Sequence, residues 1–93
     1  MEKDIQGFRG LTAWQKAYAL TLDVYKASNV FPKEEVYALS SQLRRAAVSV
    51  PSNIAEGYER THRKKYLQFL SVAKGSLGEI ETQLLLAKDL GYI

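Results

Sequence analysis

Basic side chains gather in the middle of this sequence, where they could contact the phosphates of a nucleic acid. Between residues 44 and 74, seven basic residues face only two glutamates, whereas the whole chain carries a net charge of +3. Such a local excess favours an anionic partner, although a solvated helix face has a similar composition. The candidate nucleic-acid contacts are Arg44, Arg45, Arg60, Arg63, Lys64 and Lys65.

The residue types needed for catalysis or metal binding are scarce. The chain has no cysteine and a single histidine, His62, which lies in the basic segment RTHRKK. Lys74-Gly75-Ser76 lacks the glycine-rich approach of a phosphate loop, and Glu56 with His62 is only a remote catalytic pair. We therefore expect a protein that is not an enzyme and that uses no cofactor and no metal.

The composition also predicts where the protein resides. Absence of cysteine fits a reducing compartment. The first residues lack the apolar segment of a secretion signal, and no apolar stretch approaches the roughly 20 residues of a membrane helix. We expect a cytoplasmic protein with no membrane contact.

Apolar residues recur at helical spacing along most of the chain, and no segment alternates as a strand does. The pattern predicts one all-α domain over residues 1–93, an antiparallel up-and-down helical bundle. After a tail over 1–11, helices are expected at about 12–28, 33–59 and 62–90. Thr12 and Gln15 form a capping-box pattern at the first start, and Pro32 or Lys33 is expected to open the second helix.

The second and third predicted helices have the most regular patterns. The apolar repeat of the second keeps its phase across Pro51, which predicts one helix that is bent there rather than two helices. Gly75 and Gly78 lie off the heptad seam of the third helix, as surface glycines or as sites of close approach. That seam is Tyr66, Leu70, Ala73, Leu77, Ile80, Leu84 and Ala87.

The other side chains of these helices are expected to divide between surface and core. The side of the second helix opposite its apolar seam is expected to pack against or bind something, because it holds small and polar residues in place of long charged ones: Arg45, Ser49, Ser52, Asn53, Glu56 and Arg60. Four aromatic residues are expected in the core: Trp14, Tyr18, Tyr25 and Tyr66. No aromatic residue interleaves with the basic run, so contact with phosphates or with duplex shape is the expected mode of any nucleic-acid binding.

The string SQLRRAAVSVPSNIAEGYER, followed by YLQFLSVAKGSLGEIETQLLLAKDLGYI, resembles the four-helix-bundle proteins encoded in intervening sequences of bacterial 23S ribosomal RNA genes. It is also similar to the accessory variability proteins of diversity-generating retroelements. The resemblance spans about residues 8–93. The family pattern falls here on Arg44, Arg45, Ser49, Pro51, Asn53, Glu56, Gly57 and Arg60.

This resemblance implies a bundle that assembles into a ring-like homopentamer. The accessory proteins are nucleic-acid binders that act beside a reverse transcriptase, whereas no biochemical role is implied for the ribosomal relatives. Family members continue past the GYI-like segment with a fourth helix, but the sequence stops at Ile93. Three helices must then cover faces meant for four, which makes another oligomer a second expectation.

Two functions remain open on the sequence. The first is an oligomeric, non-enzymatic bundle that binds structured RNA or other nucleic acid through its basic patch. The alternative is a structural or protein-interaction bundle with no nucleic-acid role. Self-association is expected in either case because the apolar sector of the first helix is wider than one neighbour requires.

Overall fold

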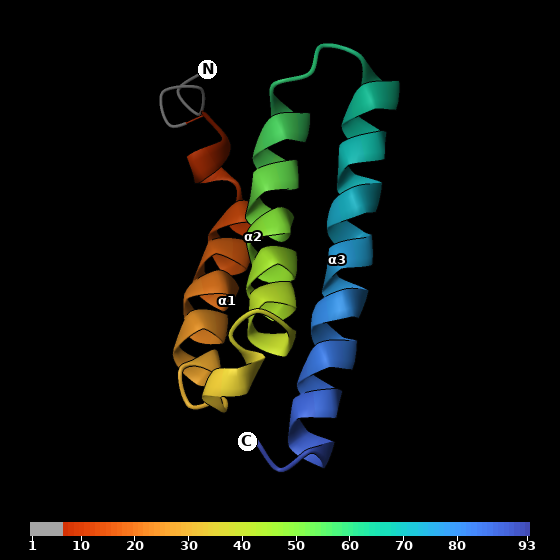
Figure 1. The fold of residues 1–93 in the computed structure, drawn as a ribbon. Helices are drawn as coiled ribbons and strands as arrows, with labels where there is room; N and C mark the ends of the chain where they lie inside the picture. The colour runs from red at the N-terminus through yellow and green to blue at the C-terminus, as the bar shows by residue number, and fades with distance from the viewer. Residues whose placement is uncertain (1–6) are drawn as a thin grey trace.

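The computed structural model describes residues 7–93, and the described chain is entirely helical or irregular. A 3₁₀ turn, η2 (Gly7–Gly10), precedes three helices, α1 (Thr12–Ser28), α2 (Leu39–Tyr58) and α3 (Arg63–Asp89); a second 3₁₀ turn, η3 (Lys33–Glu35), lies between α1 and α2. Consecutive helices run in opposite directions (Figure 1). The prediction of an all-α, up-and-down antiparallel arrangement is confirmed.

The three helices form a row with α2 in the middle (Figure 1). Both α1 and α3 pack on α2, but no Cα atom of α1 lies within 8 Å of one in α3. The molecule is accordingly long and flat, with extents of 48 × 24 × 18 Å. Apolar residues from all three helices contribute to the core, which is centred on Leu43, Ala47 and Val50 of α2.

The first helix has its predicted bounds but not its predicted cap. Leu11 is the N-cap residue and contributes no side-chain hydrogen bond, and Gln15 donates instead to the carbonyl of Arg9 at 2.9 Å. Trp14 stacks on Tyr18, with ring centroids 5.0 Å apart. Tyr18 and Tyr25 are exposed, so the prediction that both lie in the core is wrong.

The second helix begins later than predicted. Lys33–Glu35 is a separate 3₁₀ turn, and the non-helical backbone of Ala38 (φ −125°, ψ −104°) separates it from the start of α2 at Leu39. The Glu35 carboxylate accepts a hydrogen bond from the N–H of Leu39 at 3.1 Å. This side chain therefore satisfies one of the free donors that every helix start presents.

The end of the chain returns to this same turn. The Tyr92 hydroxyl donates to the second carboxylate oxygen of Glu35 at 2.7 Å, and its ring lies 5.6 Å from that of Phe31. Hydrogen bonding from Tyr92 and Leu39 lowers the pKa of Glu35, and the same carboxylate raises the pKa of Tyr92. Glu35 thus ties the start of α2 to the segment that follows α3.

Helix α2 continues through Pro51, as predicted. Proline has no N–H, so the carbonyl of Ala47, four residues earlier, loses its helical donor. The Thr21 hydroxyl of α1 lies 3.0 Å from that carbonyl oxygen and donates to it, sharing the proton with the carbonyl of Ala17 at 2.9 Å. An interhelical contact thereby replaces the hydrogen bond that Pro51 removes.

Candidate nucleic-acid interface

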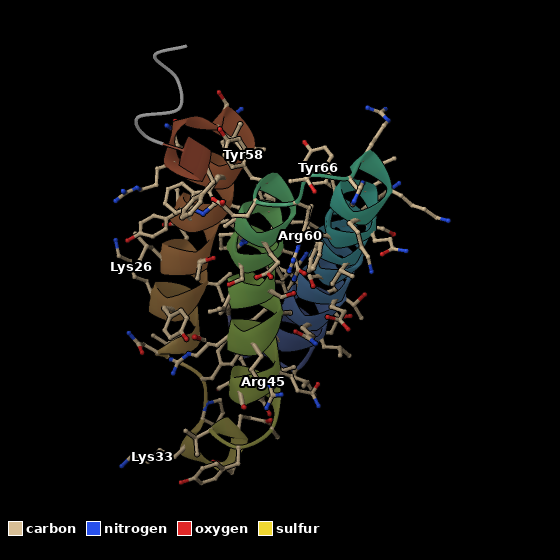
Figure 2. The ribbon with its side chains drawn as sticks, turned by 90° about the horizontal axis from the view of Figure 1, so that it is seen from above. Lys26, Lys33, Arg45, Tyr58, Arg60 and Tyr66 are labelled. Carbon is tan, nitrogen blue, oxygen red and sulfur yellow. The ribbon has the colours of Figure 1, made fainter. Side chains whose placement is uncertain are left out.

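The six basic candidates do not form one patch. Arg44 and Arg45 lie near the start of α2, whereas the other four lie where α2 ends and α3 begins. At 1.5 Å per residue, the part of α2 from Arg45 to its end at Tyr58 spans about 20 Å, and Arg60 lies beyond that end. Figure 2 shows this separation, with Arg60 between α2 and α3 and Arg45 farther along α2.

Arg44 has a structural role. Its Nε donates to the buried Ser28 hydroxyl at 2.7 Å, and its Nη2 donates to the Asn29 side chain at 3.0 Å. The guanidinium carbon lies 4.9 Å from the centre of the Tyr25 ring. These contacts fasten the end of α1 to α2, and contact of Arg44 with nucleic acid stays a prediction.

Arg45 is exposed and lines a polar groove between α2 and α3 with a volume of about 640 Å³. Glu79 lies on the opposite helix in the same groove. Gln83 also lines it, and its buried Oε1 has no hydrogen-bond partner. Because this groove contains an acidic as well as a basic side chain, Arg45 differs from the other basic residues in its electrostatic surroundings as well as in its position.

Two residues of the recognised string form part of the α2–α3 contact. The Asn53 amide donates to the Ser49 carbonyl and hydroxyl at 2.8 and 2.9 Å, and the buried Ser76 of α3 donates to the Ser49 hydroxyl at 2.8 Å. Both residues belong to the polar side of the second helix, which was expected to pack against or bind something. Ser49 lies at the contact with α3 through its hydrogen bond with Ser76, and Asn53 holds Ser49 from the next turn of α2.

The other four candidates and His62 form what we call the basic tip: Arg60, His62, Arg63, Lys64 and Lys65. All five are exposed, and no acidic residue occupies the first turn of α3. Cations there are opposed by the positive end of the helix dipole, so their clustering does not stabilise the helix. The side chains of Arg63, Lys64 and Lys65 make no ion pair with any described residue.

A pocket of about 410 Å³ lies within the basic tip. Its wall combines three basic side chains with one aromatic ring and one carboxylate: Arg60, His62, Lys65, Phe69 and Glu59, together with Thr61. The sequence did not single out Phe69 for this site. The signal was present in the spacing, because Lys65 and Phe69 are four residues apart and share a face of α3.

Arg60 is positioned by neighbours on both helices. It forms an ion pair with Glu56 one turn earlier on α2, and its guanidinium carbon lies 4.9 Å from the centre of the Phe69 ring. Gly57 permits this arrangement, because a Cβ built there would lie 3.1 Å from the Phe69 Cβ and 3.3 Å from the Tyr66 carbonyl oxygen. Glu56 and Gly57 thus both determine where the side chain of Arg60 lies.

None of the helices in residues 7–93 is both long enough and apolar enough to cross a bilayer. None of the curated proteins compared with the chain matches it. The family described as 23S rRNA-intervening sequence protein matches residues 9–93, which is nearly the whole sequence. This match includes all three helices and the basic tip, and the chain therefore belongs to the 23S rRNA-intervening sequence protein family.

Proposed function

We propose that this protein is a non-enzymatic, oligomeric nucleic-acid-binding bundle whose binding surface is the basic tip. The observation that carries the proposal is the pocket at the tip, which Arg60, His62 and Lys65 line together with the Phe69 ring. Beside it, Arg63, Lys64 and Lys65 make no ion pair with any described residue and are free to neutralise phosphates. Structured RNA is the proposed ligand, and the bacterial cytoplasm is the proposed setting.

The proposed surface is smaller than the basic run of the sequence. Arg44 is engaged by Ser28 and Asn29, and Arg45 lies in a groove that also holds Glu79. The phosphate contacts proposed here are therefore those of the tip, with Arg63, Lys64 and Lys65 as the principal ones. A reverse transcriptase, which the resemblance implies for the accessory proteins, is a possible partner of the assembled protein.

Self-association belongs to the same proposal. Large apolar side chains are exposed on the outer two helices, among them Tyr18 and Leu22 of α1 and Leu77 and Leu85 of α3. Burying one such side chain contributes about 1.5–3 kcal/mol, so a second chain would gain from covering several. Each added subunit would bring another basic tip, and repeated weak sites increase avidity for a long polyanion.

The test removes charge from one end of the molecule at a time. We expect the triple variant Arg63→Gln, Lys64→Gln, Lys65→Gln to weaken binding to an RNA hairpin, measured by fluorescence anisotropy. Each lost phosphate contact should reduce the slope of log affinity against log salt by about one unit. The matched control is Lys26→Gln, Lys33→Gln, Lys88→Gln, which removes the same charge at the opposite end.

The control should keep most of the hairpin affinity. Equal losses in the two variants would show that only net charge is sensed. Failure of the wild-type protein to bind any RNA at low salt would favour the alternative, a structural or protein-interaction bundle. Circular dichroism and mass measurement on both variants would establish that helicity and subunit number are unchanged.

A further inference from the structure

The guanidinium of Arg60 is held by two neighbours. Its central carbon lies over the Phe69 ring, 4.9 Å from the ring centre, and the Glu56 carboxylate pairs with its Nη2. Its side chain nevertheless keeps 41% of its surface exposed and forms part of the 410 Å³ pocket wall. A planar cation is therefore fixed in orientation by neighbours that leave it accessible.

A guanidinium held in this way matches the needs of a nucleobase. Unpaired bases stack on aromatic rings and on arginine planes, and a fixed plane loses little side-chain entropy when it does so. Lys65 and His62 line the same pocket as Arg60, and Lys65 supplies a cation for a flanking phosphate. A base inside a duplex is already stacked on both faces and could not reach this plane.

We propose that Arg60, backed by Phe69, is a stacking platform for one unpaired nucleobase of the bound strand. This inference rests on the proposed function and adds to it the class of nucleic acid, namely single-stranded loops, bulges or ends. It adds a contact with one base to the phosphate contacts expected from the sequence. Gly57 contributes indirectly, because it admits Phe69 to the position that supports Arg60.

The competing role for the same contacts is mechanical. The Arg60–Phe69 contact joins the end of α2 to α3 and could serve only to hold the two helices together. The two roles differ in what Arg60→Lys would do. Lysine keeps the positive charge and loses the plane, so a stacking platform would lose affinity for unpaired bases while a phosphate contact would survive.

The experiment compares a single-stranded RNA oligonucleotide with a blunt RNA duplex of equal length, by fluorescence anisotropy at one salt concentration. We expect Arg60→Lys and Phe69→Leu each to weaken single-strand binding by about five- to a hundredfold, as loss of one base stack does. Duplex affinity should change by less than about twofold. Arg45→Lys, on the same helix but outside the pocket, is the matched control and should change neither affinity.

A spectroscopic signal reports on stacking directly in the wild-type protein. A single-stranded RNA carrying 2-aminopurine should lose fluorescence on binding, and Arg60→Lys should restore it at saturating protein. Unchanged fluorescence in the wild-type complex would overturn the platform even if a variant failed to fold. Equal losses for single strand and duplex would also overturn it and leave the proposed function standing. Absence of binding to both forms would remove the proposed function itself.

Discussion

A single glycine sets the distance between α2 and α3 at the basic tip. We expect Gly57→Ala to lower the free energy of unfolding by about 1 kcal/mol, because overpacking costs more than the helix propensity that alanine adds. The Cβ and the carbonyl oxygen that crowd the new methyl group lie close to or within the backbone of α3 and cannot rotate away. Urea denaturation followed by circular dichroism measures the change.

The matched control is Gly75→Ala. A Cβ built at Gly75 meets nothing within 4 Å, so only the gain in helix propensity remains, and we expect about 0.5–1 kcal/mol of stabilisation. Stabilisation by both substitutions would contradict the close approach at Gly57. Within one chain, a Cβ built at Gly78 likewise meets no described atom within 4 Å, as at a surface glycine.

At the residue scale, the sequence identified the basic residues that are candidates for phosphate contact, but not the side chains that each of them contacts within the protein. Arg44 and Arg45 are adjacent in the chain, yet one is fixed by Ser28 and Asn29 and the other lies in a polar groove. The partners of Arg44 are 15 and 16 residues away on another helix, so no local spacing could reveal them. Phe69 shares a face of α3 with Lys65, but its contact with Arg60 spans the turn between α2 and α3 and follows no helical spacing.

At the scale of the helices, Pro51 and Thr21 form a coupled pair. We expect Thr21→Val to lower the free energy of unfolding by about 1–3 kcal/mol, because it leaves the Ala47 carbonyl without a donor. In a Pro51→Ala background the new N–H can bond to that carbonyl, so the same substitution should cost less. A double-mutant cycle by chemical denaturation measures the difference.

A coupling energy near zero would show that the Thr21 hydroxyl serves Ala17 rather than Ala47. Thr21→Ser supplies the control, because serine keeps the hydroxyl and should retain most of the stability. Periodicity in the sequence predicted that the helix continues through Pro51. It could not predict the compensating donor, which comes from a residue 26 positions away from Ala47.

The helix bounds were likewise predicted where local signals determine them and missed where distant contacts do. The first helix has the predicted span, Thr12–Ser28, because helical propensity and apolar spacing agree along it. The second begins at Leu39, where the carboxylate of Glu35 accepts a hydrogen bond from the first helical N–H. The other oxygen of that carboxylate is bound by Tyr92, 57 residues away, a contact that local spacing could not predict. Leu77 fits the heptad seam of the third helix but is 45% exposed, because α1 does not reach α3.

At the scale of the molecule, the open row of helices predicts association. We expect a mass above that of one 10.5 kDa chain by light scattering at micromolar concentration, because isolated chains would expose several leucines and tyrosines. Leu77→Glu and Leu85→Glu should each shift the mass toward the monomer. Lys74→Glu, which adds a carboxylate elsewhere on α3, is the control and should not.

A monomeric wild-type protein under these conditions would contradict this expectation. A pentamer, the state implied by the resemblance, would give five times the monomer mass, and another subunit number would support the second expectation. Because Leu77 and Leu85 lie outside the basic tip, their substitution leaves each RNA-binding surface unchanged. The two variants therefore also test whether avidity for RNA follows subunit number. Affinity for a long RNA should fall as the assembly dissociates.

The row has a further consequence, for the speed of folding. Each helix contacts only the helix next to it in the chain, so most contacts join residues of one helical hairpin or the other. Proteins dominated by such local contacts fold in microseconds to milliseconds, because little loop entropy is lost before contacts form. Helix α2 belongs to both hairpins, α1–α2 and α2–α3, and we expect that either hairpin can form first during folding. The chain would then have two folding pathways with local contacts, and α2 takes part in both.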